Sequence, residues 1–329
     1  MMKATAKANA NIALVKYWGK RDEEKILPMN SSVSMTCDGL ETVTTVEFSS
    51  MYAKDSVSIN GEDMEKDTKN VYAHIEKIRR LAGTKENAKV VSKTNFPVAA
   101  GLASSASGFA ALTVAACVAA GLKLSQKDLS ILARQGSGSA SRSLCEGFAV
   151  WHKGAKSDGS DSYAESIATK EHWKDFHMLA AIVKETAKKT SSRAGMSQTM
   201  KTSPYYRGWL ETVEKDIAKI REGINKKDFI AVGSVAEFNA LKMHCAMMTT
   251  QPPIIYWEPK SVEIIRAVQS WREEGLESYF TMDAGPNVNV MCLKKDEKEI
   301  TKRLKALGIA KVIACAPGDG ARLVKEHLF

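Results

Sequence analysis

The earliest clear pattern along the chain is an alternation of apolar and polar residues, which is typical of strands with one buried face. It runs through residues 43–48 and again through 55–59, and Asn60-Gly61 follows directly. Asn-Gly is a preferred pair for a two-residue hairpin turn. The sequence therefore predicts antiparallel sheet early in the chain.

Helical and extended segments then follow each other. A helical period covers residues 71–81, a strand is expected over 89–94, and residues 104–120 form a stretch without charge that predicts a helix buried on most sides. Ser125 with Asp128 three residues later resembles a capping box and opens a helix to about residue 135. Further strands are expected over 147–151 and 178–184.

The second half of the chain is mostly helical. Helical spacing extends from Ser191 to about residue 247, with interruptions expected near Gly223 and Gly233, and Pro252-Pro253 ends it. A helix over 261–274 and two strands, one ending at residue 282 and one over 288–293, follow. Because no repeat or linker is seen, we expect a two-lobed α+β body divided into residues 1–184 and 185–329.

Composition narrows the class of protein. With 329 residues, 44% hydrophobic and 26% charged, the chain is globular. No run approaches the roughly 18 apolar residues of a membrane span, and the start lacks a secretory pattern. The six cysteines form no CxxC pair and no cluster at metal-ligand spacing, so we expect reduced thiols in the cytoplasm. His244, beside Cys245, is expected to be structural or capping.

The net charge of +9 allows nucleic acid, an anionic membrane or phosphorylated small molecules as partners. Basic and acidic residues are interleaved, without a block of like charges. The pattern therefore favours a solvated basic surface, then a site for phosphorylated ligands, with nucleic acid and membrane disfavoured.

A loop of small residues joins the strand ending at Thr94 to the apolar helix; its sequence is Pro97-Val98-Ala99-Ala100-Gly101-Leu102-Ala103-Ser104-Ser105-Ala106-Ser107. Small residues let the backbone approach a ligand, and amide groups at a helix start attract phosphate. A tight turn followed by a serine N-cap explains the same residues. The loop is not a Walker loop, because GxxxxGK[ST] is absent.

This loop resembles the phosphate-binding motif PxxxGLxSSA of the GHMP kinase superfamily. Ala103 stands where most of those kinases have glycine, which is typical of one branch, the mevalonate diphosphate decarboxylases. Segments 11–20, 136–143 and 281–287 resemble the same branch, and 191–196 and 243–253 do so more weakly.

The resemblance implies the two-lobed GHMP kinase fold, with an N-terminal lobe like domain 2 of ribosomal protein S5, a ferredoxin-like C-terminal lobe and a deep active-site cleft. It also implies ATP-dependent conversion of mevalonate 5-diphosphate to isopentenyl diphosphate through 3-phosphorylation, with release of ADP, phosphate and carbon dioxide. ATP and Mg²⁺ are the implied cofactors, no carboxylate is assigned to the metal, and relatives often form homodimers.

Three residues carry the implied chemistry. Asp283, in a Gly-Pro turn, would accept or orient the 3-hydroxyl proton, although alone it is also a turn-capping residue. Lys16 follows an apolar run and would pair with Asp283, unless it is an edge-strand lysine that reaches solvent. Arg142 would hold the substrate carboxylate, or cap the carbonyls of the preceding loop.

Other positions match substrate and nucleotide contacts of the branch. The substrate set is Tyr17, Lys20, Ser139, Ser141, Arg193, Ser192 and Met196, of which Ser192 and Met196 match a closing loop. Tyr17 and Trp18 could equally be core aromatics, and core is preferred for Trp18. The ATP set is Ser92, Asn95, Gly101, Leu102, Ala103, Ser104, Ser105 and Ser107.

Three other activities remain open from the sequence. The same chemistry on mevalonate 5-phosphate differs by one phosphate, and no motif separates the two substrates. A 3-kinase that stops after phosphorylation is disfavoured, because Asp283, Lys16 and Arg142 are all present. A basic nucleic-acid-binding module is a reading from another class, and it predicts salt-sensitive polyanion binding without ATP turnover.

Overall fold

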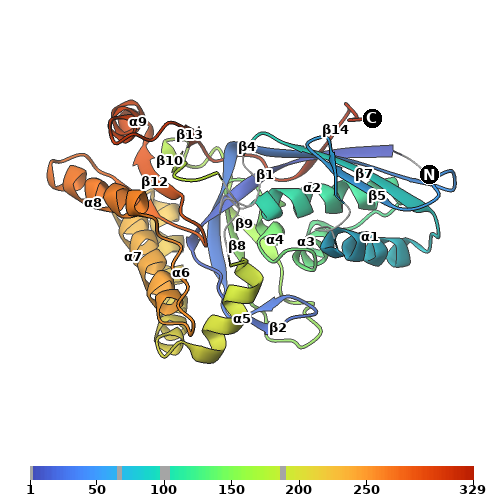
Figure 1. Cartoon of the computed structure of the whole chain (residues 1–329), viewed down its shortest axis with the longest axis horizontal. Coiled ribbons are helices and arrows are strands. Elements are labelled where there is room, and N and C mark those ends of the chain that lie inside the picture. The colour runs from blue at the N-terminus through green and yellow to red at the C-terminus, as the bar shows by residue number, and fades with distance from the viewer. Residues whose placement is uncertain (1–2, 65–68, 97–103, 186–189) are drawn as a thin grey trace.

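The structure is a computed structural model that describes residues 3–64, 69–96, 104–185 and 190–329. It has two lobes that share long central strands (Figure 1). The fold is the two-lobed α+β architecture expected from the sequence.

An eight-stranded sheet forms the first lobe. The strand order is β14-β1-β4-β7-β5-β6, with β8 paired to β4 and β9 paired to β8; β5 and β7 are parallel. The bounds are β1 (Lys3–Val15), β4 (Ser32–Ser49), β5 (Ser56–Ile59), β6 (Glu62–Asp63), β7 (Asn87–Thr94), β8 (Phe148–Trp151), β9 (Ala164–Ala168) and β14 (Arg322–Val324). A separate ribbon pairs β2 (Lys20–Asp22) with β3 (Leu27–Pro28).

Four helices accompany this sheet: α1 (Lys69–Ala82), α2 (Ser104–Ala119), α3 (Gln126–Arg134) and α4 (Ala140–Ser143). Helix α2 is buried along most of its length, because its small side chains let it pack closely on β1 and β4. Ala4, Ala6 and Ala8 of β1 lie in the core that contains α2, whereas Ile12 and Leu14 of the same strand lie in the core of the second lobe. Strand β1 therefore connects the two cores.

A four-stranded antiparallel sheet, ordered β11-β12-β10-β13, forms the second lobe. Its strands are β10 (Phe176–Ala181), β11 (Tyr279–Thr281), β12 (Val288–Leu293) and β13 (Val312–Cys315), and its helices are α5 (Ser192–Thr202), α6 (Tyr206–Lys226), α7 (Phe229–Met248), α8 (Pro259–Glu273) and α9 (Glu297–Ala306), with a 3₁₀ turn over Lys294–Asp296. Met178 and Ala180 join the core with α6 and α7, and Leu179 and Ala181 join the core with α8 and α9. The sheet is thus covered on both faces.

Several predicted local features are confirmed. Asn60 and Gly61 have φ of 54° and 88° and connect β5 to β6 as an antiparallel hairpin. Ser125 caps α3 by accepting the Asp128 N–H at 3.1 Å. Within the described residues, no helix combines the length and the apolarity that crossing a membrane requires.

The two interruptions expected near Gly223 and Gly233 are a single break between them. Helices α6 and α7 run through these glycines, and the break falls at Lys227, which adopts a left-handed φ of 56°. A Cβ at Gly223 would lie 2.8 Å from Val232 Cγ2, and one at Gly233 would lie 2.1 Å from the Tyr279 ring. These glycines therefore allow close packing and do not end helices.

Several elements were not predicted, among them β1 and α4. Strand β1 is rich in Ala, Asn and Lys, which have weak β propensity, and pairing with β4 and β14 makes it a strand. Helix α4 forms where only a small-residue loop was expected. The chain also crosses between lobes: β10, before residue 185, lies in the second sheet, and β14 returns to the first.

Candidate active site

A cavity of about 590 Å³ lies where the end of β1 meets both lobes. Its walls come from β7, α1 and α2, from the loop between α3 and α4, and from α5, α7 and the turn after β11. The charged residues that line it are Lys16, Lys20, Lys93, Arg142, Arg193 and Asp283. Five cations against one carboxylate suit an anionic ligand.

Lys16 and Asp283 form an ion pair in this cavity. The Lys16 Nζ donates to Asp283 Oδ1 at 2.7 Å and to the Ala13 carbonyl at 2.8 Å. The Lys16 side chain is 1% exposed and that of Asp283 is 23% exposed, so only the carboxylate faces solvent. Lys16 therefore does not reach solvent from an edge strand.

Burial and charge act in opposite directions on this pair. Burial lowers the pKa of Lys16, and the neighbouring Asp283 carboxylate opposes that lowering. The buried Lys16 ammonium thus lies against Oδ1 of a carboxylate that faces the cavity. The pair fits a role in acid–base chemistry at the cavity wall.

Arg142 lies on α4 and is 2% exposed. Its Nε donates to Ser34 Oγ at 2.9 Å and to Asn11 Oδ1 at 3.1 Å, and its Nη1 donates to Ser32 Oγ. Burial lowers the pKa of Arg142 to about 10, and Asp283 opposes that lowering. Among the described residues no carboxylate forms an ion pair with it, so its charge is available to a carboxylate ligand.

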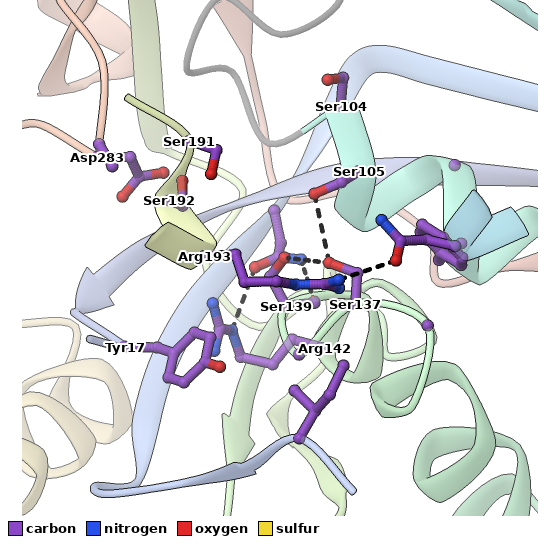
Figure 2. A pocket seen from close by; sticks show the side chains of 18 of the residues that line it. Tyr17, Ser104, Ser105, Ser137, Ser139, Arg142, Ser191, Ser192, Arg193 and Asp283 are labelled. Atoms are coloured by element: carbon purple, nitrogen blue, oxygen red, sulfur yellow. Dashed lines mark hydrogen bonds between the residues drawn. The ribbon is translucent and has the colours of Figure 1, made fainter. Parts of the chain in front are cut away.

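Serine hydroxyls gather at another part of the cavity, where the start of α2 faces the loop before α4. Ser137 Oγ donates to Ser105 Oγ at 3.3 Å, and it lies 3.5 Å from Ser139 Oγ. Figure 2 shows these serines and Ser104 on one side of Arg193, with Asp283 and Ser192 on the other. Uncharged donors at a helix start are suited to phosphate.

The remaining predicted substrate residues are placed as follows. Arg193 donates to Asn70 Oδ1 at 2.8 Å, and Lys20 forms an ion pair with Glu23 at 2.5 Å. Tyr17 lines the cavity, and burial raises the pKa of its hydroxyl. Ser192 and Met196, at the start of α5, also line it. Trp18 is 2% exposed and belongs to the core, as preferred.

Three predicted site residues are not among the described residues that line the cavity. Ser141 Oγ donates to the Gly138 carbonyl at 2.7 Å, and Ser107 Oγ bonds with Thr42 Oγ1 at 2.8 Å, so both hydroxyls are used inside the fold. Asn95 accepts the Glu41 N–H and donates to the Gly39 carbonyl, which ties the end of β7 to β4. The assignment of these three residues to ligand binding stays a prediction.

The predicted ATP residues divide further. Ser92, Ser104 and Ser105 line the cavity. Gly101, Leu102 and Ala103 lie outside the described residues. An apolar part of the cavity between β5, β7, α1 and α2 was not predicted, and its lining includes Val57, Ile59, Val71, Val90 and Leu112.

The sequence analysis missed residues that hold Arg142 and Lys16 in place, although the sequence offered a signal for some of them. Ser32 and Ser34 alternate along β4, so both hydroxyls face Arg142. Asn11, inside the quoted segment 11–20, holds Arg142 from the other side. Asn239, buried in α7, accepts the Lys16 N–H at 2.8 Å, and nothing in its neighbourhood along the chain signals this contact.

The described residues contain no group of three or more His, Cys, Asp or Glu side chains that could hold a metal ion. Magnesium is commonly bound through substrate phosphates and few protein groups. The hydroxyls of Ser105, Ser137 and Ser139 therefore fit a metal that arrives with a nucleotide, and a closed protein cage is not required.

Comparison with known proteins gives a consistent result along the chain. Residues 8–164 match the Diphosphomevalonate decarboxylase-like N-terminal domain, and residues 178–316 match the Mevalonate 5-diphosphate decarboxylase C-terminal domain. A diphosphomevalonate decarboxylase of Ganoderma lucidum is 40% identical over 321 residues, covering 91% of this chain and 80% of that protein. The human diphosphomevalonate decarboxylase is 36% identical and covers 88% of this chain and 76% of that protein.

Solved structures agree with the sequence comparison. The mevalonate diphosphate decarboxylase from Staphylococcus aureus superposes with a TM-score of 0.93 at 38% identity, covering 98% of each chain. The protein MDDEF, in complex with MVAPP, AMPPCP and magnesium, superposes with a TM-score of 0.92 at 44% identity, covering 99% of each chain. Both similarities span the two lobes and the cavity between them.

Proposed function

Because this chain belongs to the diphosphomevalonate decarboxylase family, we propose that the cavity is the site of ATP-dependent decarboxylation of mevalonate 5-diphosphate to isopentenyl diphosphate. The observation that carries the proposal is the buried Lys16–Asp283 pair in the same cavity as Arg142, whose charge has no carboxylate partner among the described residues. One arrangement thus offers a proton acceptor and a carboxylate-binding group.

Phosphorylation is the first step. The 3-hydroxyl oxygen of the substrate attacks the γ-phosphorus of ATP, the bond to the leaving ADP oxygen breaks, and Asp283 takes the hydroxyl proton. The Lys16 ammonium lies 2.7 Å from Asp283 Oδ1 and places positive charge beside the site of the transfer. With a crowded tertiary alcohol as the acceptor, positioning and charge stabilisation provide most of the rate.

Elimination is the second step. The C3–O bond breaks as phosphate leaves, the electron pair of the C1–C2 bond forms the new C2=C3 double bond, and carbon dioxide departs. Arg142 orients the substrate carboxylate from a rigid setting of Asn11, Ser32 and Ser34. The Arg142 guanidinium is held mainly by hydroxyl groups, so it can orient the substrate carboxylate as a single cation. A second fixed cation would stabilise the carboxylate further and oppose the loss of carbon dioxide.

The other cavity residues divide between substrate and nucleotide. We assign the diphosphate to Tyr17, Lys20, Ser139 and Arg193, and closure over the ligands to Ser192 and Met196. Ser92, Ser104 and Ser105 are assigned to ATP, and the apolar part between β5 and α1 is suited to its base. Magnesium, when bound with ATP, neutralises phosphate charge, and Ser105 and Ser137 are the residues that would hold it.

We further propose a cytoplasmic homodimer that binds neither nucleic acid nor membranes. Surface ion pairs such as Arg207–Glu211 and Lys226–Glu222 support the part of this proposal that concerns nucleic acid and membranes, because paired cations attract polyanions less. The division into 1–184 and 185–329 stays a prediction, and the strand exchange between the sheets argues for a first boundary before β10.

The test incubates purified protein with ATP and magnesium and, in separate reactions, mevalonate, its 5-phosphate and its 5-diphosphate. ADP and carbon dioxide are measured, and the 5-diphosphate is expected to give both in equal amounts. ADP without carbon dioxide would indicate a 3-kinase, and turnover of the 5-phosphate alone would reassign the substrate. Salt-sensitive binding to DNA without any turnover would overturn the proposal that the protein is an enzyme.

A further inference from the structure

Lys16 is held by its backbone as well as by its side chain. It follows the last residue of β1, and its N–H donates to Asn239 Oδ1 of α7 at 2.8 Å. Its carbonyl accepts from Asn30 Nδ2, also at 2.8 Å. Asn239 is 0% exposed and Asn30 is 1% exposed, so water does not compete for these bonds.

The amide of Asn239 can point in only one direction. Its Nδ2 donates to Asp216 Oδ2 of α6 at 2.6 Å, and Lys242 Nζ donates to the same oxygen at 2.6 Å. An ionised carboxylate accepts hydrogen bonds and cannot donate them, so the amide nitrogen must face Asp216. The amide oxygen then faces Lys16, and Lys242 balances the charge of Asp216.

We propose that Asn239, oriented by Asp216 and Lys242, is a positioning residue for the Lys16–Asp283 pair. The inference rests on the proposed function, because it assigns Asn239 an effect on turnover that acts through Lys16. Asn239 takes the place of a sheet partner for the Lys16 N–H, and without it the Lys16 backbone could shift. A misplacement of about 1 Å can reduce a rate by about 10²-fold. Asn239 contacts the backbone of Lys16 and is not itself a catalytic residue.

The test exchanges the two polar groups. Asn239→Asp keeps an acceptor for the Lys16 N–H and places a second carboxylate against Asp216. We expect kcat to fall at least tenfold, with the KM for ATP within twofold of the parent. The double variant Asn239→Asp/Asp216→Asn restores a donor facing an acceptor and preserves net charge, and its kcat is expected within threefold of the parent.

Controls separate this role from ordinary stability. Ala240→Gly weakens the same helix at the next buried position, and its kcat is expected within twofold of the parent although its melting temperature falls. If Asn239→Asp does not fold, Asp216→Asn replaces it, with several-fold lower kcat expected because the amide is no longer oriented. A folded Asn239→Asp with parent kcat, or a folded double variant without recovery, overturns the proposal.

A measurement without turnover keeps the two proposals distinguishable. Hydrogen exchange at the Lys16 amide is expected to be slow in the parent and the double variant, and faster in Asn239→Asp. A parent that releases no carbon dioxide refutes the proposed function, whatever the exchange shows. An active parent with unchanged exchange in Asn239→Asp refutes the positioning role alone.

Discussion

The two ends of the cavity differ in the charge and the burial of the side chains that line them. At the serine end, Ser105, Ser137 and Ser139 are uncharged, short and partly accessible (Figure 2). Ser137 Oγ lies 3.3 Å from Ser105 Oγ and 3.5 Å from Ser139 Oγ. At the charged end, Lys16 and Arg142 are almost fully buried and each is fixed by several hydrogen bonds.

This difference follows from the free energy of desolvation. A hydroxyl loses little when it leaves water, so a few serines can share the binding of a phosphate without an elaborate setting. An ammonium or guanidinium taken out of water must be compensated by partners in good geometry. The charged end is therefore where single changes should have the largest effects, and the predictions below run from that end to the serine end.

The largest effect is expected for Asp283→Asn. Loss of the proton acceptor should reduce kcat by about 10²–10⁴-fold, and Lys16 becomes a buried cation without its partner. ATP affinity, measured by calorimetry, should stay near that of the parent. Asp319→Asn, which removes a surface carboxylate paired with Lys170, is the control and should keep kcat. An Asp283→Asn kcat within a few fold of the parent would show that this carboxylate is misassigned.

A smaller loss is expected for Arg142→Lys, because an ammonium cannot hold a carboxylate in the bidentate way of a guanidinium. We expect carbon dioxide release to slow by about 10²-fold, measured with saturating ATP. Arg134→Lys is a matched control: Arg134 is equally buried, and its Nη1 donates to the Gly159 carbonyl at 2.8 Å. That change should lower the melting temperature and leave kcat nearly unchanged. Equal loss of kcat in both variants would mean that Arg142 is only structural.

Each lobe also contains a buried histidine, and the two histidines should make the free energy of unfolding depend on pH. Burial lowers the pKa of His74, beside α2, to about 3, and that of His244, in α7, to about 4. In the unfolded chain each histidine takes up a proton near pH 6.5, whereas in the folded protein it does so only near its lowered pKa. The free energy of unfolding therefore decreases as the pH falls below 6.5 toward the pKa values of the folded protein. Each histidine contributes a slope that approaches about 1.4 kcal/mol per pH unit. Urea unfolding between pH 7 and 5 measures this slope.

His74→Gln separates one of these contributions, because glutamine cannot take up the proton and can still donate to Thr113. The variant should lose less stability than the parent over the same pH range. His152→Gln serves as the control, since His152 is partly exposed beside Glu165. A parent slope that His74→Gln leaves unchanged would contradict the assignment.

The smallest effect is expected at the serine end, for Ser105→Ala. One neutral hydrogen bond contributes about 1 kcal/mol, so the KM for ATP should rise about fivefold. Steady-state kinetics should show kcat within threefold of the parent, and Ser270→Ala on the exposed face of α8 should change neither value. A kcat loss as large as that of Arg142→Lys would remove the contrast between the two ends.

The same contrast explains what could be predicted from the sequence. The small-residue loop around Ser104 and Ser105 suggests phosphate binding from local residues alone, whereas Ser139 was assigned through the family resemblance. The Asn60-Gly61 hairpin and the α3 cap are equally local. Lys16 and Asp283 are 267 residues apart, and their pairing was expected only through the family resemblance.

What could not be predicted depends on tertiary packing. The misjudged glycines in α6 and α7 look like helix breaks until Val232 and Tyr279 are placed against them. Ser107 carries a plausible motif position, yet its hydroxyl is used by Thr42 of another strand. Asn239 has no signal at all, because its partners lie on α6 and at the end of β1.

Strand β14 determines when the first sheet can be completed during synthesis of the protein. Residues 322–324 pair with residues 5–7 of β1, beside which β14 lies (Figure 1). Lys3 Nζ also donates to the Phe329 carbonyl at 3.0 Å. On the ribosome, the β1 edge of the first sheet stays open until residues 322–324 have been translated. An open edge invites pairing with other chains, so β1 is exposed to aggregation until β14 is added.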